Sequence, residues 1–128
     1  MRVFKNTVFT RFAKKAGITD EALCKAIQNA EKGLVDADLG GGLIKQRVAR
    51  QGAGKSGGFR TIILFKKGDR SFFVYGFAKN KIANISDTDL MALKKLAAHM
   101  LNCDSSYIES LIDEKLLIEV DYEKETIS

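Results

Sequence analysis

The chain has few of the residues that would link it to metal, redox or imidazole chemistry. It contains two cysteines, one histidine and no proline among 128 residues. Cys24 and Cys103 stand alone in helical patterns, so they indicate neither a metal-binding pair nor a disulfide framework, and we expect both to be reduced core residues. His99 is the only histidine, which excludes a mechanism based on two imidazoles. Asp36 and Asp38 stand alone between a helix and a strand, so we expect neither a metal site nor a cofactor.

Long apolar runs are also absent. No run approaches the roughly 20 residues that cross a bilayer, and the N-terminus lacks the apolar core and cleavage site of a signal peptide. We therefore expect a cytoplasmic protein with no membrane partner. The content of 45% apolar and 29% charged residues is ordinary for a soluble protein. A chain of this length buries roughly two-thirds of its extended surface, enough for one domain with its own core.

Acidic residues are almost missing from the middle of the chain. Residues 45–81 include ten Lys and Arg but one acid, Asp69, whereas residues 104–128 include eight acids and two basic residues. This asymmetry indicates an anionic partner such as nucleic acid, although lysines on strands can also protect a sheet edge from pairing. We expect a domain over residues 1–103 and an acidic extension over residues 104–128 that packs on it.

The apolar periodicity predicts an α+β fold, in which an N-terminal helix hairpin packs on a small antiparallel sheet and C-terminal helices follow. Gly17 is placed to end the first helix, and Thr19 and Ser86 are placed to begin later helices as N-caps. Side chains alternate along residues 44–48, which puts Lys45 and Arg47 on the same face of a strand. The expected elements are a strand at 2–4, helices at about 7–15 and 20–33, main strands at 44–48, 59–65 and 71–77, helices at 87–100 and near 106–115, and a possible strand at 117–122.

Each of the first three helices has an apolar stripe at helical spacing. The stripes predict which side chains face the sheet, and the first two helices are expected to cover one face together. The expected inward residues are Val8, Phe9, Phe12 and Ala16 in the first helix, Leu23, Ala26, Ile27 and Ala30 in the second, and Leu90, Leu93, Leu96, Ala97 and Met100 in the third.

Residues 49–56 come close to the pattern of a phosphate-binding P-loop, Gly-x-x-x-x-Gly-Lys-Ser/Thr. Gly57 and Gly58 would break the helix that such a loop requires, and the aromatic and β-branched residues at 59–65 favour a strand. No later strand ends in an aspartate placed to hold magnesium. The sequence therefore does not favour a nucleotide hydrolase.

The basic segment has the side chains that RNA cleavage needs. RNA carries its own nucleophile, the 2′-hydroxyl, so a protein need only align it with the neighbouring phosphate, move its proton and stabilise the extra charge. A cluster of cations stabilises that charge, and a lysine crowded by other cations becomes a better base. The candidates, which lie on or beside adjacent predicted strands, are Lys45, Arg47, Lys55, Arg60 and Lys79.

Three stretches of this segment resemble the RelE/HigB superfamily of toxins from bacterial type II toxin–antitoxin systems. They are Lys45-Gln46-Arg47, the run from Gly54 to Arg60, and Phe77-Ala78-Lys79-Asn80. The resemblance covers roughly residues 1–100. It implies a compact mRNA endoribonuclease, often acting in the ribosomal decoding site, and a cognate antitoxin that holds the toxin inactive.

The resemblance also implies roles for individual residues. Arg60 matches the strand arginine that stabilises the transition-state phosphate. Arg47 and Lys55 would bind phosphate or take part in proton transfer, and Lys79 lies at the end of the facing strand. The sequence departs from many relatives in having Asn80 where they have arginine and no tyrosine near residue 86. The expected RNA-binding residues are Lys45, Arg50, Lys66, Tyr75 and Lys81.

Two other functions fit the same residues. The superfamily includes gyrase-inhibiting toxins that are not nucleases, and a non-catalytic RNA- or DNA-binding module would show similar basic strands. The number of candidate cations favours the nuclease over the gyrase inhibitor. RNA-binding sheets typically carry a pair of exposed aromatic residues, and the sequence shows no such pair, which argues against the simple binding module.

Overall fold

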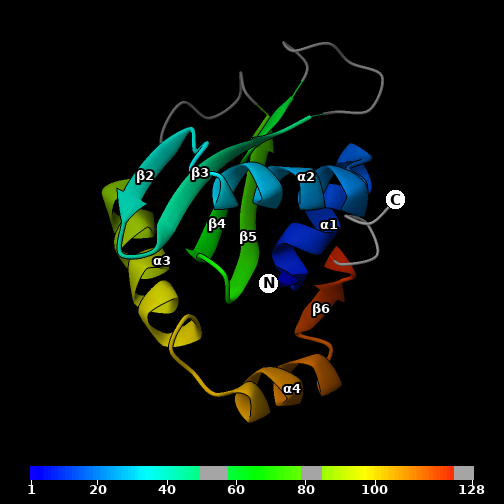
Figure 1. Ribbon diagram of the computed structural model, residues 1–128, viewed down its shortest axis with the longest axis vertical. Helices are drawn as coiled ribbons and strands as arrows, with labels where there is room; N and C mark the ends of the chain where they lie inside the picture. Colours follow the sequence, from blue (N-terminus) through cyan, green and yellow to red (C-terminus); the bar gives the residue numbers. More distant parts are fainter. Residues whose placement is uncertain (50–57, 79–84, 123–128) are drawn as a thin grey trace.

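Six strands and four helices form the part of the chain that the computed structural model describes, residues 1–49, 58–78 and 85–122 (Figure 1). In chain order they are β1 (Arg2–Asn6), α1 (Thr7–Ala16), α2 (Asp20–Glu31), β2 (Ala37–Gly40), β3 (Leu43–Val48), β4 (Phe59–Lys66), β5 (Arg70–Ala78), α3 (Asp87–Met100), α4 (Ser105–Asp113) and β6 (Leu117–Val120). None of the helices in these residues has the length and apolar character needed to cross a membrane.

All six of these strands belong to one mixed sheet with the order β2-β3-β4-β5-β1-β6. β1 runs parallel to β5, and the other neighbouring strands are antiparallel. The α+β class is therefore confirmed, but the expectation of a small antiparallel sheet is wrong in both size and pairing. A period of two identifies a strand but does not identify its neighbours, and β1 and β5 lie far apart in the sequence.

Each face of the sheet has its own apolar core. On the face covered by α1 and α2, the rings of Phe9 and Phe73 lie 5.0 Å apart and both side chains are fully buried. On the face that meets α3 and α4, Phe4 stacks on Phe72 at 5.1 Å. Val3 and Phe4 belong to opposite cores, as the alternation along a strand requires. Each fully buried phenylalanine contributes about 1.5–3 kcal/mol relative to an exposed one.

Three predicted helix ends, at Gly17, Thr19 and Ser86, are confirmed by their capping geometry, while α2 ends at Glu31, two residues before the expected end at Gly33. Thr19 Oγ1 accepts a hydrogen bond from the backbone N–H of Ala22 at 3.2 Å, and Ser86 Oγ accepts one from Asp89 at 3.2 Å. Gly17 has φ +74°, the left-handed conformation that glycine adopts without steric cost at a helix C-terminus. These local signals fix where the helices begin and end, and therefore which apolar stripe meets the sheet.

Two residues that were expected to face inward lie outside the core. Val8 is 54% exposed and Leu96 is 38% exposed. In α1 the buried residues are Phe9 and Ala13, and Val8 is turned about 100° away from Phe9 around the helix axis. In α3 the buried residues Ala97 and Met100 make the contact with the core, which leaves Leu96 on the flank of the stripe.

The residues that follow position 103 are built into the sheet as far as the structure describes them. β6 pairs with β1 at the edge of the sheet, and Val120 is buried. Arg2 Nη2 donates hydrogen bonds to Glu109 Oε1 at 2.8 Å and to Glu119 Oε1 at 2.9 Å. Two acids of the C-terminal region are thus paired with the first strand, while a domain boundary at residue 103 stays a prediction.

Candidate functional site

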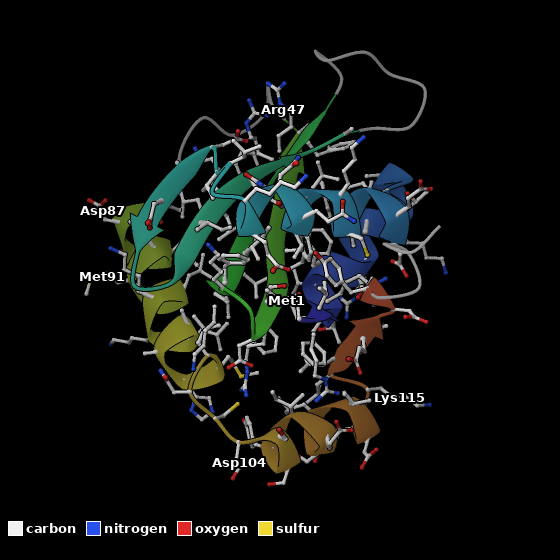
Figure 2. All side chains as sticks on the ribbon, in the orientation of Figure 1. Met1, Arg47, Asp87, Met91, Asp104 and Lys115 are labelled. Atoms are coloured by element: carbon white, nitrogen blue, oxygen red, sulfur yellow. The ribbon has the colours of Figure 1, made fainter. Side chains whose placement is uncertain are left out.

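Two arginines face each other across adjacent strands. Arg47 of β3 lies opposite Arg60 of β4, and Figure 2 shows Arg47 at the end of the sheet farthest from α4. The backbone N–H of Phe65 donates to the carbonyl of Gly42 at 2.8 Å. Since bonded pairs alternate along an antiparallel ladder, Arg47 and Arg60 form a non-hydrogen-bonded pair, the type with closer side chains. Like charges in this arrangement repel each other and destabilise the pairing.

Arg60 also has a buried donor with no acceptor among the described residues. Its Nη1 is buried, and no residue that the structure describes accepts a hydrogen bond from it, whereas Arg47 is exposed. A buried unsatisfied donor costs about 1–3 kcal/mol, and more if it is charged. An arginine stays charged at any physiological pH. The group that would satisfy this donor and reduce the repulsion is therefore an anion with several acceptor oxygens.

Lys45 and Tyr75 lie in the next row of the same sheet face. Lys45 is opposite Ile62, which is opposite Tyr75 on β5, while Arg60 is opposite Phe77. The rings of Tyr75 and Phe77 have centroids 6.0 Å apart, and half-buried Tyr75 packs against the core on this face. The strand register thus brings together three predicted cations and one predicted aromatic residue. We call Lys45, Arg47 and Arg60 the cation face.

Lys66 is not brought to the cation face. It lies at the opposite end of β4, six residues from Arg60, which is about 20 Å along a strand. Its Nζ donates to the carbonyl of Leu101 at 3.3 Å and lies 3.5 Å from Asp69 Oδ2. These contacts join the β4–β5 turn to the end of α3, so we leave Lys66 out of the proposed RNA surface.

Arg70, beside Lys66, binds the same helix end. Its Nη1 donates to the carbonyls of Met100 at 3.2 Å and Cys103 at 2.7 Å, and its Nε donates to Asp69 Oδ1 at 3.2 Å. The hydrogen bond from Arg70 is the main reason that the pKa of Asp69 is lowered. The last carbonyls of a helix carry partial negative charge, which a cation stabilises. Part of the positive charge of residues 45–81 is thus structural.

Four predicted site residues lie outside the described residues: Arg50, Lys55, Lys79 and Lys81. The roles assigned to them stay predictions, as does the P-loop comparison at residues 49–56. The strand expected from residue 59 is confirmed as β4.

His99 lies away from the cation face. Its ring meets the ring of Tyr107 edge-on, with centroids 5.1 Å apart, where α3 approaches α4. In the described ranges, no three or more His, Cys, Asp or Glu side chains are grouped so that they could hold a metal ion. The described chemistry at the cation face is therefore that of arginine, lysine and tyrosine.

The sequence matches a protein-family model along most of its length. The model, described as the RelE toxin of the RelE/RelB toxin–antitoxin system, matches residues 1–120. The chain belongs to the RelE toxin family. No curated protein matches the chain. Membership identifies a toxin of a toxin–antitoxin system and implies a cognate antitoxin as partner. The match includes α4 and β6, which lie beyond the resemblance at residues 1–100.

Gln46 positions the cation face of this RelE-family toxin, a role that the sequence analysis did not assign. Its side chain is 3% exposed and has three partners. Nε2 donates to the carbonyls of Ala26 at 3.0 Å and Leu34 at 2.9 Å, and Oε1 accepts from the backbone N–H of Asp36 at 3.1 Å. These bonds tie β3 to α2 and to the connection before β2, directly beside Arg47. The sequence could have indicated this role, because Gln46 stands on the inward side of an alternating strand, and a buried amide must form hydrogen bonds.

Proposed function

We propose that this toxin is an endoribonuclease that cleaves messenger RNA by attack of the RNA's own 2′-hydroxyl on the adjacent phosphate, without a metal ion. The strongest support is Arg60, which lies opposite Arg47 and whose buried Nη1 finds no acceptor within residues 1–49, 58–78 and 85–122. A phosphate between the two arginines would supply acceptor oxygens and reduce their repulsion. Because negative charge on the phosphate oxygens increases during attack, these donors would bind the transition state more strongly than the substrate.

The proposed step forms one bond and breaks another at phosphorus. The 2′-oxygen bonds to phosphorus while the bond to the 5′-oxygen breaks, leaving a 2′,3′-cyclic phosphate and a 5′-hydroxyl. A base takes the 2′-proton, and an acid gives a proton to the departing 5′-oxygen. Arg60 stabilises the non-bridging oxygens, and Arg47 orients the phosphate. From the sequence, our candidates for proton transfer are Lys55 and Lys79.

Other residues of the same surface would hold the RNA chain. Lys45 is half-buried in the row next to the arginines, where it would bind a neighbouring phosphate. Tyr75 offers a ring on which a base could stack. From the sequence we add Arg50 and Lys81 as RNA contacts. As toxins of this family often act on the ribosome, we propose that cleavage takes place in the decoding site.

The antitoxin would control this activity through the cation face. An acidic segment of the antitoxin placed over Arg47 and Arg60 would supply the acceptors that the phosphate supplies in the reaction, and would exclude RNA by electrostatic competition. The toxin would then be inactive in the complex and active once free.

Induced expression in a bacterium tests the proposed reaction. We expect growth arrest together with new messenger ends that carry 2′,3′-cyclic phosphates, detected by ligation methods specific for that end. Coexpression of the cognate antitoxin should restore growth. Arrest with intact messenger and cleaved chromosomal DNA would instead support a gyrase-inhibiting toxin. Arrest without cleavage of either nucleic acid would favour a non-catalytic binding module.

A further inference from the structure

A cleft lies on the α2 side of the sheet, next to the end of β3 that carries Arg47. Its volume is about 460 Å³, and it lies between α2 and the end of β3. Arg47 belongs both to the lining of this cleft and to the arginine pair. The lining also includes Ala22, Lys25, Asn29, Leu34, Asp36 and Ala49.

We propose that this cleft binds one nucleotide of the RNA chain, next to the phosphate held by Arg47 and Arg60. The inference rests on the proposed function, because it requires RNA at the cation face. Arg47 provides the link, because it lines the cleft and also lies opposite Arg60: an RNA chain whose phosphate lies at the arginine pair would pass the end of β3 to place its neighbouring nucleotide in the cleft. The volume falls within the range of about 300–1,000 Å³ that is usual for small-ligand sites.

The charge of the lining suits a phosphodiester. Lys25 and Arg47 are exposed cations at the cleft, whereas Asp36 is the one acid among the described lining residues. Lys25 lies on α2 and Arg47 on β3, so the two cations come from the two elements between which the cleft lies. A chain that enters the cleft from Arg47 would keep its backbone within reach of Lys25, and long cationic side chains adapt readily to phosphate.

The remaining lining suits a nucleobase. Leu34, 62% exposed, and Ala22 and Ala49 offer apolar contact to the face of a base. Asn29 can both donate and accept hydrogen bonds, and Asp36 can accept from an exocyclic amino group. Apolar walls with a few polar groups at the edge are the usual construction of a site that orients a small ligand.

The floor of the cleft is rigidly held. Gln46 uses its amide on Ala26, Leu34 and Asp36, as described above. Three residues of the cleft lining, Ala26, Leu34 and Asp36, are therefore fixed to β3 through one buried side chain. A site that is already in its binding shape costs less ordering free energy when the ligand enters.

Another hollow in the described residues lacks this chemistry. It measures about 250 Å³ and lies between α3 and α4. Its described lining includes Leu96 and Leu116 and contains neither lysine nor arginine. RNA is therefore better matched by the cleft at Arg47.

A series of RNA oligonucleotides of increasing length tests the proposal. The oligonucleotides carry 2′-O-methyl sugars, which cannot attack the phosphate, and their affinity for the full-length toxin is measured by fluorescence anisotropy. We expect one added nucleotide in the series to raise the affinity roughly three- to tenfold, the equivalent of about one net hydrogen bond. That step is the contribution of the cleft.

Two variants fill the cleft, Ala22→Leu on α2 and Ala49→Leu after β3. Each should abolish the three- to tenfold step while leaving the affinity of shorter oligonucleotides unchanged. Two variants are used because Ala22 touches the core, whereas Ala49 is exposed and can be replaced without disturbing it. Circular dichroism confirms that each variant is folded.

Lys25→Ala removes a cation from the cleft, and Lys32→Ala is its matched control. Lys32 follows α2, two helical turns beyond Lys25, and is exposed. Lys25→Ala should reduce the slope of log Kd against log salt by about 0.7 for oligonucleotides that reach the cleft. Lys32→Ala should leave that slope and the affinity step unchanged.

Three outcomes would overturn the inference, and they are distinguishable. If the filled variants give the same length series as wild type, RNA does not enter the cleft, although the proposed function stands. If they bind RNA normally but lose the antitoxin, the cleft belongs to the protein partner. If wild type binds no oligonucleotide of any length, the cation face is not an RNA surface, and both proposals fail.

Discussion

Arg60 and Arg70 lie in the same hairpin, β4 and β5, but their surroundings give them different roles. Arg70 Nη1 donates to the carbonyl of Met100, at the end of α3, and to that of Cys103, just after it, whereas the buried Nη1 of Arg60 has no acceptor in the part of the chain that the structure describes. Sequence position alone could not separate the two, because the acceptors for Arg70 come from the end of α3. At the residue scale, the useful distinction is therefore between cations whose donors are satisfied within the fold and cations whose donors are not.

Replacing Arg60 with alanine should reduce RNA cleavage by roughly 10²–10³-fold, the usual cost of losing one transition-state donor. The fold should remain, because the substitution removes a cross-strand repulsion between two arginines. Cleavage is measured with messenger and ribosomes, and stability by urea unfolding. Arg11→Ala is the matched control, since Arg11 is exposed on α1, at the other face of the sheet. Equal cleavage by Arg60→Ala and wild type would refute the catalytic assignment.

Ionisation of Tyr122 should lower the free energy of unfolding at alkaline pH. Burial, and then its hydrogen bond to Glu31 Oε1 at 3.0 Å, raises the pKa of Tyr122 to about 12. In the unfolded chain a tyrosine has a pKa of about 10. Between these values the unfolded chain has lost a proton that the folded chain keeps, so the contribution is complete below about pH 10 and is lost toward about pH 12.

The corresponding variant is Tyr122→Phe, which has no proton to lose. Its free energy of unfolding should decline less steeply than that of wild type between about pH 10 and 12. Urea unfolding followed by circular dichroism at several pH values measures both curves, and only their difference is interpreted because lysines titrate in the same range. Parallel curves would show that the ring ionises equally in the folded and unfolded chains.

At the scale of secondary-structure elements, the β4–β5 hairpin holds α3 in place through its turn. Arg70→Ala should lower the free energy of unfolding by about 1–3 kcal/mol, because the carbonyls of Met100 and Cys103 lose a charged donor. The arginine side chain is 12% exposed, so water would replace it poorly. Lys67→Ala, in the exposed turn next to it, should change stability by less than about 0.5 kcal/mol. Equal urea midpoints for the two variants would contradict this role of Arg70.

Helix ends and strand faces were predictable because they depend on residues that are close together in the sequence. Thr19 and Ser86 cap helices as expected, and the alternation around Lys45 and Arg47 correctly placed both on one face of β3. The register of two antiparallel strands then brought Arg60 opposite Arg47. The parallel pairing of β1 with β5 had no comparable signal, since it depends on the path of the chain through α1 and α2. β2 was missed because four residues, Ala37–Gly40, with a bulge in their pairing, show no alternation.

At the scale of the whole molecule, the cation face and the acids of the C-terminal region lie on different strands, separated along the strand order of the sheet. The cation face lies on β3 and β4, whereas the described acids of residues 104–122 lie on or near α4 and β6, beyond β5 and β1. Three strand spacings separate β4 from β6, about 14 Å. Glu109 and Glu119 are also engaged by Arg2. Direct screening of the cation face by these acids is therefore not expected.

Salt dependence can show whether the acidic side of the molecule nevertheless weakens RNA binding. Charges interact over about 8 Å at 0.15 M salt and about 30 Å at 0.01 M. Neutralising two exposed acids of the α4 end, Asp113→Asn with Glu114→Gln, should leave RNA affinity unchanged at 0.15 M and raise it at 0.01 M. The double variant should keep the fold, because negative charge at a helix C-terminus is unfavourable and its removal does not destabilise α4. Anisotropy titrations at both salt concentrations measure the effect. A gain of affinity at 0.15 M would mean that these acids approach the RNA site, and would place the C-terminal region in direct control of RNA binding.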